Sequence, residues 1–166
     1  ELVVRAVGVG TEALGRFAEG TPIPVLGPLG VPFPIDDLKQ SDRVALVAGG
    51  IGLAPLVLLS RRLAERGIPA DLFYGGRNES EVLKRPDFER FLGAHRCRYA
   101  TDDGSLGKKG RVTDILAAAL QAGTSYRRVY ACGPVPMFRT LAAILEARNV
   151  EGSFALESEM ACGFGV

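Results

Sequence analysis

The chain has 166 residues and a formal net charge of +1, with 47% hydrophobic and 23% charged residues. This length suits one to one and a half small α/β units with a sizeable core. The balanced composition excludes a disordered chain, a nucleic-acid-binding surface and an acidic polymer as the partner, and it favours a small-molecule ligand.

The ends and the cysteines of the chain indicate its setting. No apolar run reaches the roughly 18 to 20 residues of a membrane span, and no basic-then-apolar leader opens the sequence, so we expect a cytoplasmic protein. Cys97, Cys132 and Cys162 form neither an even disulfide set nor a CxxC pair, which indicates a reducing compartment. The chain begins at Glu1 in a strand-like run and stops at Val166 within a glycine-rich stretch, so we expect a piece of a longer protein.

Residues 1–40 differ in character from the rest of the chain. They hold an alternating, strand-like run, LVVRAVGV, and later the turn-rich stretch GTPIPVLGPLGVPFPIDD. Alternation with frequent Gly and Pro is typical of antiparallel strands joined by tight turns. We therefore expect this segment to be part of an antiparallel barrel that is too small to fold alone.

Residues 41–158 alternate between short apolar strands and helical segments. The expected strands are the five runs VALVAGG, ADLFYGG, RCRYATDD, RRVYACG and SFALESE. Strands separated by helices indicate right-handed crossovers within one parallel sheet. The predicted fold class is α/β, with a five-stranded, doubly wound, nucleotide-binding sheet.

The junction between the first strand and its helix is the most informative motif. The run VALVAGGIGLAP places Gly49, Gly50, Ile51 and Gly52 between an apolar strand and a helix start, with Pro55 in the first helical turn. Backbone N–H groups left uncovered at the positive end of a helix can bind a pyrophosphate. The same glycines could instead let the helix pack closely on the sheet, so both interpretations stay open.

The other strands also end in glycine or polar residues. Ligands of open parallel sheets bind at the carboxyl ends of the strands, so these residues are expected to line one crevice. They are Gly75, Gly76 and Arg77; Thr101, Asp102, Asp103 and Gly104; Cys132, Gly133 and Pro134; and Glu157 and Glu159. Turn geometry alone explains such residues at any single strand, but their recurrence at every strand favours a ligand crevice.

These motifs together resemble those of the ferredoxin reductase superfamily. AGGIGLAPL, FYGGR and YACGPVPM are similar to its NAD(P)-binding half, and VGVGTEAL and GPLGVPF are similar to the trailing strands of its flavin-binding barrel. The resemblance implies electron transfer between a pyridine nucleotide, a flavin and a one-electron centre. The residues it assigns to FAD are Val3, Val4, Arg5, Gly10, Thr11, Gly27, Pro28, Leu29 and Gly30.

The same resemblance assigns NAD(H) to the strand ends. The expected contacts are Gly49, Gly50, Ile51, Gly52, Pro55, Gly76, Arg77, Asp102, Asp103, Cys132, Gly133, Pro134 and Met137. Cys132 has two interpretations: a small buried residue beneath the following helix, or, as the resemblance implies, a catalytic position that leaves room for the nicotinamide to stack on the flavin. Cys97 is expected in the core, and His95 is assigned no role.

Charges near the third strand bear on the choice of nucleotide. Asp102 and Asp103 close that strand and place negative charge near the expected adenosine end, so we expect NADH to be preferred over NADPH. Lys108, Lys109 and Arg111 form a basic patch nearby. This patch is either a solvated loop or a contact for phosphate or a partner, and it opposes the preference for NADH.

Two further segments resemble the family of dihydroorotate dehydrogenase electron-transfer subunits. They are TDDGSLGKKGRVTD and ALESEMACGFGV. The resemblance implies that Cys162 is the first ligand of a 2Fe-2S cluster completed by residues after Val166, and small neighbours would let amides approach its sulfur. It also implies a catalytic dihydroorotate dehydrogenase subunit as the partner, in a heterotetramer, with no membrane or nucleic-acid partner.

The expected organisation and function follow from these matches. Residues 1–40 would be the trailing part of a FAD-binding barrel, residues 41–158 an NAD-binding domain, and residues 159–166 the start of a 2Fe-2S domain. The leading hypothesis is a subunit that carries electrons from NADH through FAD and a 2Fe-2S cluster to a catalytic subunit of pyrimidine biosynthesis, inactive as this piece alone. The alternatives are a hydrogenase- or ferredoxin-linked flavin reductase subunit, and a domain that binds NAD(H) without turnover.

Overall fold

The computed structural model describes residues 3–25, 27 and 30–156. The chain divides into two compact units, one of Glu1–Pro32 with Glu157–Val166 and the other of Phe33–Leu156. None of the helices in the described part is both long and apolar enough to cross a bilayer.

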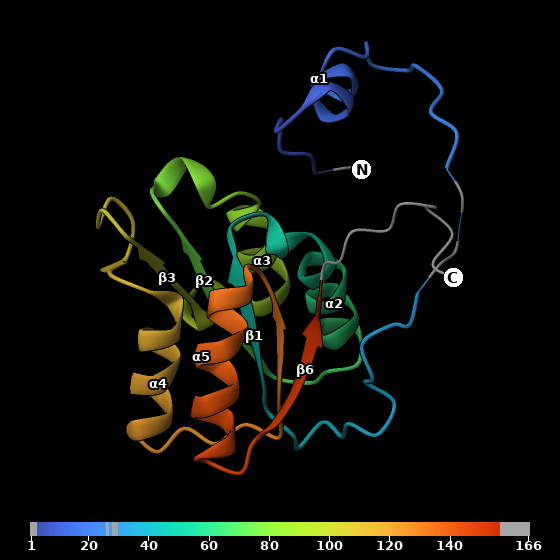
Figure 1. Ribbon diagram of the computed structural model, residues 1–166. Helices are drawn as coiled ribbons and strands as arrows, with labels where there is room; N and C mark the ends of the chain where they lie inside the picture. Colours follow the sequence, from blue (N-terminus) through green and yellow to red (C-terminus); the bar gives the residue numbers. More distant parts are fainter. Residues whose placement is uncertain (1–2, 26, 28–29, 157–166) are drawn as a thin grey trace. The chain divides into compact units, whose positions relative to one another are not determined.

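The second unit is built on one parallel sheet (Figure 1). Its strands lie in the spatial order β4-β3-β2-β1-β5-β6, and every neighbouring pair is parallel. They are β1 Val44–Gly49, β2 Ala70–Gly76, β3 Cys97–Thr101, β4 Lys108–Lys109, β5 Arg128–Cys132 and β6 Glu151–Ala155. The chain builds outward from β1 in one direction and then returns to β5 on its other side, so the strand order reverses between β1 and β5.

Helices cover both faces of this sheet, α2 and α3 one face and α4 and α5 the other (Figure 1). They are α2 Leu53–Glu65, α3 Arg85–Leu92, α4 Val112–Gln121 and α5 Val135–Glu146, with short 3-10 turns at Gly50–Gly52, Glu79–Glu81 and Ala94–Arg96. Successive strand residues point to opposite faces, so Leu46 packs with the α2 layer and Val47 with the α5 layer.

Burial explains why the first strand is a continuous apolar run. All residues from Val44 to Ala48 are 0% exposed, because helices cover the sheet on both sides. On α2, Leu56, Leu59 and Leu63 recur at helical spacing and form the stripe that faces the sheet. The central sheet is thus a rigid platform for the loops at its ends.

The predicted parallel sheet is confirmed, but it has six strands rather than five. The additional strand, β4, has two residues and pairs with the end of β3. Gly107 makes this return feasible, since its φ is +67° and an added Cβ would stand 2.1 Å from the Tyr99 carbonyl oxygen. The last strand, β6, begins at Glu151, two residues before the run SFALESE. It follows Val150, which comes after Asn149, a residue in the left-handed region with a φ of 52°.

The first unit contains one helix, α1 Val9–Gly15, and no strand among its described residues. The strand expected from LVVRAVGV is therefore wrong for those residues, since a strand needs a hydrogen-bonded neighbour. The Thr11 hydroxyl instead accepts the N–H groups of Val7 at 2.9 Å and Gly8 at 3.2 Å, and so fixes the entry to α1. The barrel itself stays a prediction.

Residues 33–40 pack within the second unit. Leu38 is 5% exposed in the core on the α2 side, and the Phe33 ring meets Tyr130 edge-on with centroids 5.3 Å apart. The compact unit accordingly begins at Phe33. A functional domain boundary at residue 40 stays a prediction.

Candidate functional site

The carboxyl ends of the strands meet at one edge of the sheet, the upper edge of the sheet in Figure 1. The last residues of the five longer strands are Gly49, Gly76, Thr101, Cys132 and Ala155. Because β1 and β5 are neighbours and the strand order reverses between them, a ligand crevice is expected at their ends. Residues that lie far apart in the sequence are thereby brought together.

Two glycines of the turn after β1 serve close packing. A Cβ on Gly52 would stand 2.2 Å from the Cys132 carbonyl oxygen, and one on Gly49 would stand 2.8 Å from Cδ of Pro134. Any side chain larger than hydrogen would push β1 and β5 apart at this end. The packing interpretation that the sequence left open therefore applies to Gly49 and Gly52.

Gly50, between them, is different. Its φ is +54°, and nothing lies within 4 Å of the place where its Cβ would stand. The turn leads directly into α2, whose N-cap residue, Gly52, provides no side-chain cap. The Leu53 N–H already donates to the Ile51 carbonyl and Pro55 has no N–H, so what the turn offers a ligand is the uncovered backbone at Gly50. Pro55 is exposed and Ile51 is half-buried.

Tyr74 braces this turn from within the sheet. Its hydroxyl lies 3.1 Å from the carbonyl oxygens of both Gly50 and Glu81, and it accepts the Leu83 N–H at 3.1 Å. Burial raises the pKa of Tyr74 to about 12, so the hydroxyl stays protonated and can donate. Sequence reasoning missed this residue, and its place in FYGG, just before a strand end, was the available signal.

A second cluster joins the loops after β2 and β3. The Glu81 carboxylate accepts the backbone N–H of Arg77 at 3.1 Å and its Nε–H at 2.8 Å. The Ser105 hydroxyl accepts the Glu79 N–H at 2.8 Å and donates to Asp103 at 2.7 Å. These bonds from Ser105 lower the pKa of Asp103. Arg77 and Asp103, both expected to contact the cofactor, are thus engaged within their own loops.

The remaining charges of this region are exposed. Asp102 is exposed, and its N–H donates to the Gly76 carbonyl at 3.1 Å. Lys108, Lys109 and Arg111 are also exposed, on β4 and at the start of α4. Groups of both signs therefore surround the expected adenosine end, and the preference for NADH stays a prediction.

The turn after β5 is packed rather than open. Cys132 is 3% exposed and lies in the core on the α2 side, which matches the buried interpretation of this residue. A Cβ on Gly133 would stand 2.5 Å from Cε of Met137, and Pro134 is the N-cap of α5. Placement of the nicotinamide by Cys132 stays a prediction.

Two residues with little expected function fit their surroundings. Cys97 is half-buried and packs against the core on the α2 side; burial raises the pKa of its thiol to about 11. The His95 ring packs over Gly93, with Cε1 2.9 Å from the place of an added Cβ. Neither residue lies at the carboxyl edge.

The expected FAD contacts belong to the first unit, and Pro28 and Leu29 lie outside the described residues. Nothing lies within 4 Å of a Cβ position on Gly10, so its backbone is open, as approach of a phosphate requires. The Thr11 hydroxyl donates to the Gly8 carbonyl at 3.0 Å and is engaged in its own turn. The other expected contacts within the described part are Val3, Val4, Arg5, Gly27 and Gly30.

Residues 3–25, 27 and 30–156 contain no group of three or more His, Cys, Asp or Glu side chains that could hold a metal ion. Cys162, the expected cluster ligand, lies outside these residues. The cluster prediction thus depends on sequence resemblance.

Comparisons with known proteins agree with a nucleotide site. The family model described as "Oxidoreductase NAD-binding domain" matches residues 46–143. The chain is 38% identical over 164 residues to "Dihydroorotate dehydrogenase B (NAD(+)), electron transfer subunit" of Shouchella clausii, covering 99% of this chain and 60% of the relative. It is 39% identical over 164 residues to the protein of the same name from Geobacillus thermodenitrificans, covering 99% and 61%.

A solved structure supports the fold. The NADH-dependent reduced ferredoxin-NADP oxidoreductase, described with flavin-based electron bifurcation, matches with a TM-score of 0.83 at 29% identity, covering 98% of this chain and 57% of that one. This chain spans about three-fifths of the length of the curated relatives that it matches. The similarity to electron transfer subunits expected from the sequence is confirmed.

Proposed function

This chain belongs to the oxidoreductase NAD-binding domain family, and from this premise we propose that it binds NAD(H) at the carboxyl edge of its sheet, as part of an electron transfer subunit. The open turn at Gly50 carries the proposal, because no side chain covers the backbone where the chain enters α2. Similarity over 99% of the chain to dihydroorotate dehydrogenase B subunits supports the wider role.

The pyrophosphate would bind at Gly50 and the first turn of α2. The positive end of the helix dipole favours an anion there, and backbone N–H groups of the turn can donate to its oxygens. Gly49 and Gly52 hold this turn tightly against the end of β5. Tyr74 restrains the Gly50 carbonyl, so less conformational freedom is lost when the nucleotide binds.

The nicotinamide would lie beside the turn after β5. Gly133 and Pro134 present little side chain there, while Met137 fills the space behind them. Cys132 would act as a small buried support under this turn rather than as a nucleophile. The bound nicotinamide supplies hydride chemistry, and the residues of this chain hold it in place.

FAD and a 2Fe-2S cluster complete the proposed subunit, with residues 1–40 on the flavin side and residues 159–166 at the start of the cluster domain. A flavin held there would supply the link between two-electron and single-electron chemistry. The open Gly10 backbone would receive a flavin phosphate, and Cys162 would ligate iron. In the full-length protein, Cys162→Ser should lower the iron content, and the released flavin should have the mass of FAD.

The proposed partner is the catalytic subunit of a dihydroorotate dehydrogenase. The expectation from sequence was that electrons leave NADH toward this partner. The name of the relatives includes NAD(+), the oxidised nucleotide. We therefore propose that the net transfer of electrons runs toward NAD(+) when dihydroorotate is the reductant. Hydride exchange between nicotinamide and flavin uses the same residues in both directions.

Calorimetric titration of the full-length protein with NADH tests the proposed function. Gly50→Val should weaken NADH binding at least tenfold, because it fills the space meant for the pyrophosphate. Gly123→Val is the matched control, since Gly123 also has a positive φ, +89°, and open surroundings, but lies after α4. Unchanged NADH affinity in a folded Gly50→Val protein would remove the assignment.

A related ferredoxin-linked reductase subunit is the second candidate. The match to the ferredoxin-NADP oxidoreductase, with a TM-score of 0.83, favours it. The two candidate functions are distinguished by testing whether dihydroorotate reduces NAD(+) in the complex of the full-length protein with the proposed catalytic subunit. Reduction by ferredoxin but not by dihydroorotate would select the second candidate.

A further inference from the structure

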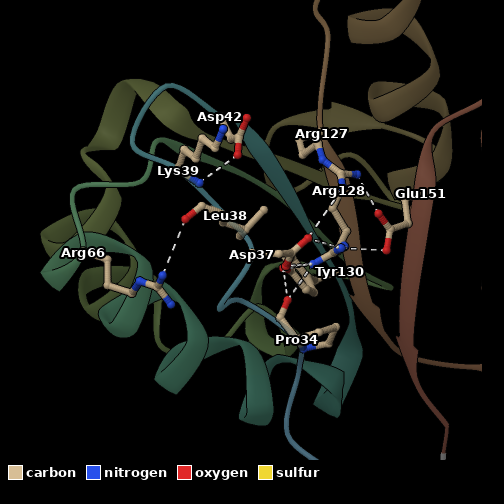
Figure 2. A network of polar contacts seen from close by, with 10 residues as sticks. All are labelled: Pro34, Asp37, Leu38, Lys39, Asp42, Arg66, Arg127, Arg128, Tyr130 and Glu151. Atoms are coloured by element: carbon tan, nitrogen blue, oxygen red, sulfur yellow. Dashed lines mark hydrogen bonds and ion pairs between the residues drawn. The ribbon is translucent and has the colours of Figure 1, made fainter.

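A strap, which we define as residues 33–38, lies against the second unit before β1, and buried groups hold it there (Figure 2). Near its start, the Phe33 ring meets Tyr130 edge-on, with an interplanar angle of 74°. At its end, Leu38 is buried with the residues of α2. The strap is therefore attached at both ends.

Arg128, at the start of β5, makes three hydrogen bonds to the strap. Its side chain is 5% exposed and forms two parallel bonds with Asp37, at 2.9 Å from Nη1 and 2.8 Å from Nη2. Nη1 also donates to the Pro34 carbonyl at 2.8 Å, and Nη2 pairs with Glu151 at 2.7 Å. The Tyr130 hydroxyl donates to the same Pro34 carbonyl at 2.5 Å. Two parallel bonds fix orientation as well as distance.

Burial of Arg128 distinguishes this clamp from an ordinary surface ion pair, although the side chains of Asp37 and Glu151 are 47% and 45% exposed. A guanidinium out of water is costly unless its charge is matched, and here two carboxylates and a carbonyl match its charge and its Nη groups, while its buried Nε has no partner. The hydrogen bonds from Arg128 lower the pKa values of Asp37 and Glu151. The bond to Asp37 raises the pKa of Arg128 in turn. The position of the strap is thus strongly specified.

The clamp lies on the strand that ends at the proposed nicotinamide site. Tyr130 and Cys132 are two residues apart on β5, so they share one face, and both belong to the core on the α2 side. The rise of a strand makes this spacing about 7 Å. Because β5 pairs with β1 and β6 along its length, the anchor and the turn belong to one rigid element.

Little chain separates the strap from the segment proposed to contact flavin. Three peptide steps lead from Gly30 to Phe33, and they span at most about 10 Å. Pro32 and Pro34 fix their own φ and bias the preceding residues toward extended backbone, so the connection is stiff. Holding Phe33 and Pro34 therefore fixes the point from which this connection leaves the second unit.

We propose that Arg128 is a positioning residue: by clamping the strap, it fixes the point where the chain leaves the NAD-binding unit toward the segment proposed to contact flavin, and hydride transfer depends on this anchor. This inference rests on the proposed function. Arg128 acts through Asp37 and Pro34 rather than on the reacting atoms. Since a misplacement of about 1 Å can slow a reaction by about a hundredfold, a loosened strap should slow transfer and leave NADH binding unchanged.

The test uses the full-length protein with its cofactors and the substitution Asp37→Asn, which keeps the shape and removes the charge. Asp36→Asn is the matched control, because Asp36 lies next to it in the strap but is fully exposed and pairs with Arg66 at 3.3 Å on the surface. We expect flavin reduction at saturating NADH to slow at least tenfold in Asp37→Asn and less than twofold in Asp36→Asn. The NADH dissociation constant should change less than twofold in both.

Hydrogen exchange provides a readout that is independent of activity. Peptides covering the strap should exchange faster in Asp37→Asn, and also in Arg128→Lys, which keeps the charge but loses the two parallel bonds. Rapid flavin reduction in a variant whose strap exchanges faster would overturn the positioning role, and so would a strap whose exchange is unchanged in both variants. A wild-type protein that binds NADH without reducing its flavin overturns the proposed function itself, before any variant is compared.

Discussion

The two ends of one sheet use their residues in opposite ways. At the carboxyl end, β1 and β2 finish in glycines, and the backbone at Gly50 faces open space. At the amino end, the second residue of β2 is a carboxylate, Asp71, that is 0% exposed. It pairs with Arg43 at 2.5 Å and Arg96 at 3.2 Å, and it accepts the Tyr126 hydroxyl at 2.7 Å.

The amino end also carries a cavity of about 750 Å³, lined in part by Asp42, Tyr126, Arg127 and Glu151. Several of its polar groups already have partners: Arg127 pairs with Glu151 at 2.6 Å, and Asp42 accepts the Lys39 backbone N–H at 2.8 Å. A ligand needs groups that the fold has not used. The comparison therefore teaches that matched ion pairs and a hollow surface at the amino end are compatible with a structural role, while the proposed binding end offers backbone that no side chain covers.

Asp71→Asn should have the largest effect on stability. Removing the charge leaves neighbouring arginines without their buried partner, and we expect a loss of about 3 kcal/mol in the free energy of unfolding. Denaturant titration of the full-length protein measures it, with Asp36→Asn as an exposed control. NADH affinity of the folded variant should stay within twofold of the wild type; a tenfold loss would break the division between the two ends.

Gly52→Ala sharpens the comparison within the carboxyl end. Its Cβ would meet the Cys132 carbonyl at 2.2 Å, so β1 and β5 must move apart, at a cost of about 2 kcal/mol. Gly50→Ala meets no neighbour and should cost about 1 kcal/mol, from its positive φ. Thermal unfolding measures the loss of stability in each variant. Equal losses in Gly52→Ala and Gly50→Ala would contradict the separation of packing and binding glycines.

The sequence was sufficient to predict the core strands and the edge at which their glycine-rich ends meet. Val44–Gly49 is a continuous apolar run because both faces are covered, and the glycines that follow it marked the turn. Local sequence could not separate Gly50 from Gly52, since the difference depends on contact with Cys132 on another strand. Arg128 was not predicted either, because its partner Asp37 lies 91 residues away.

The short strand β4 and the first unit show a second limit. Two residues are too few for an alternating pattern, so β4 left no signal, and its pairing depends on the return made by Gly107. In the first unit, alternation predicted a strand where hydrogen bonds to the Thr11 hydroxyl instead begin a helix. Pattern alone does not supply the neighbour that a strand requires.

Asp102→Asn should produce the smallest effect. Asp102 is exposed, so its repulsion of a 2′-phosphate is screened, and neutralising it should raise the specificity constant for NADPH relative to NADH about threefold. Asp103→Asn is a useful comparison, because Asp103 is held in its own loop by Ser105. Steady-state reduction of a dye with each nucleotide gives both ratios; a preference for NADPH in the wild type would show that Lys108 and Lys109 dominate.

The most direct test of the division between the two ends is a map of backbone amide shifts when NADH is added to isotope-labelled full-length protein. We predict that the amides of Gly50 and Leu53 shift strongly, while those of Asp71 and Tyr126 stay unchanged. Shifts concentrated at Asp71 and Tyr126, with Gly50 and Leu53 unaffected, would contradict the account.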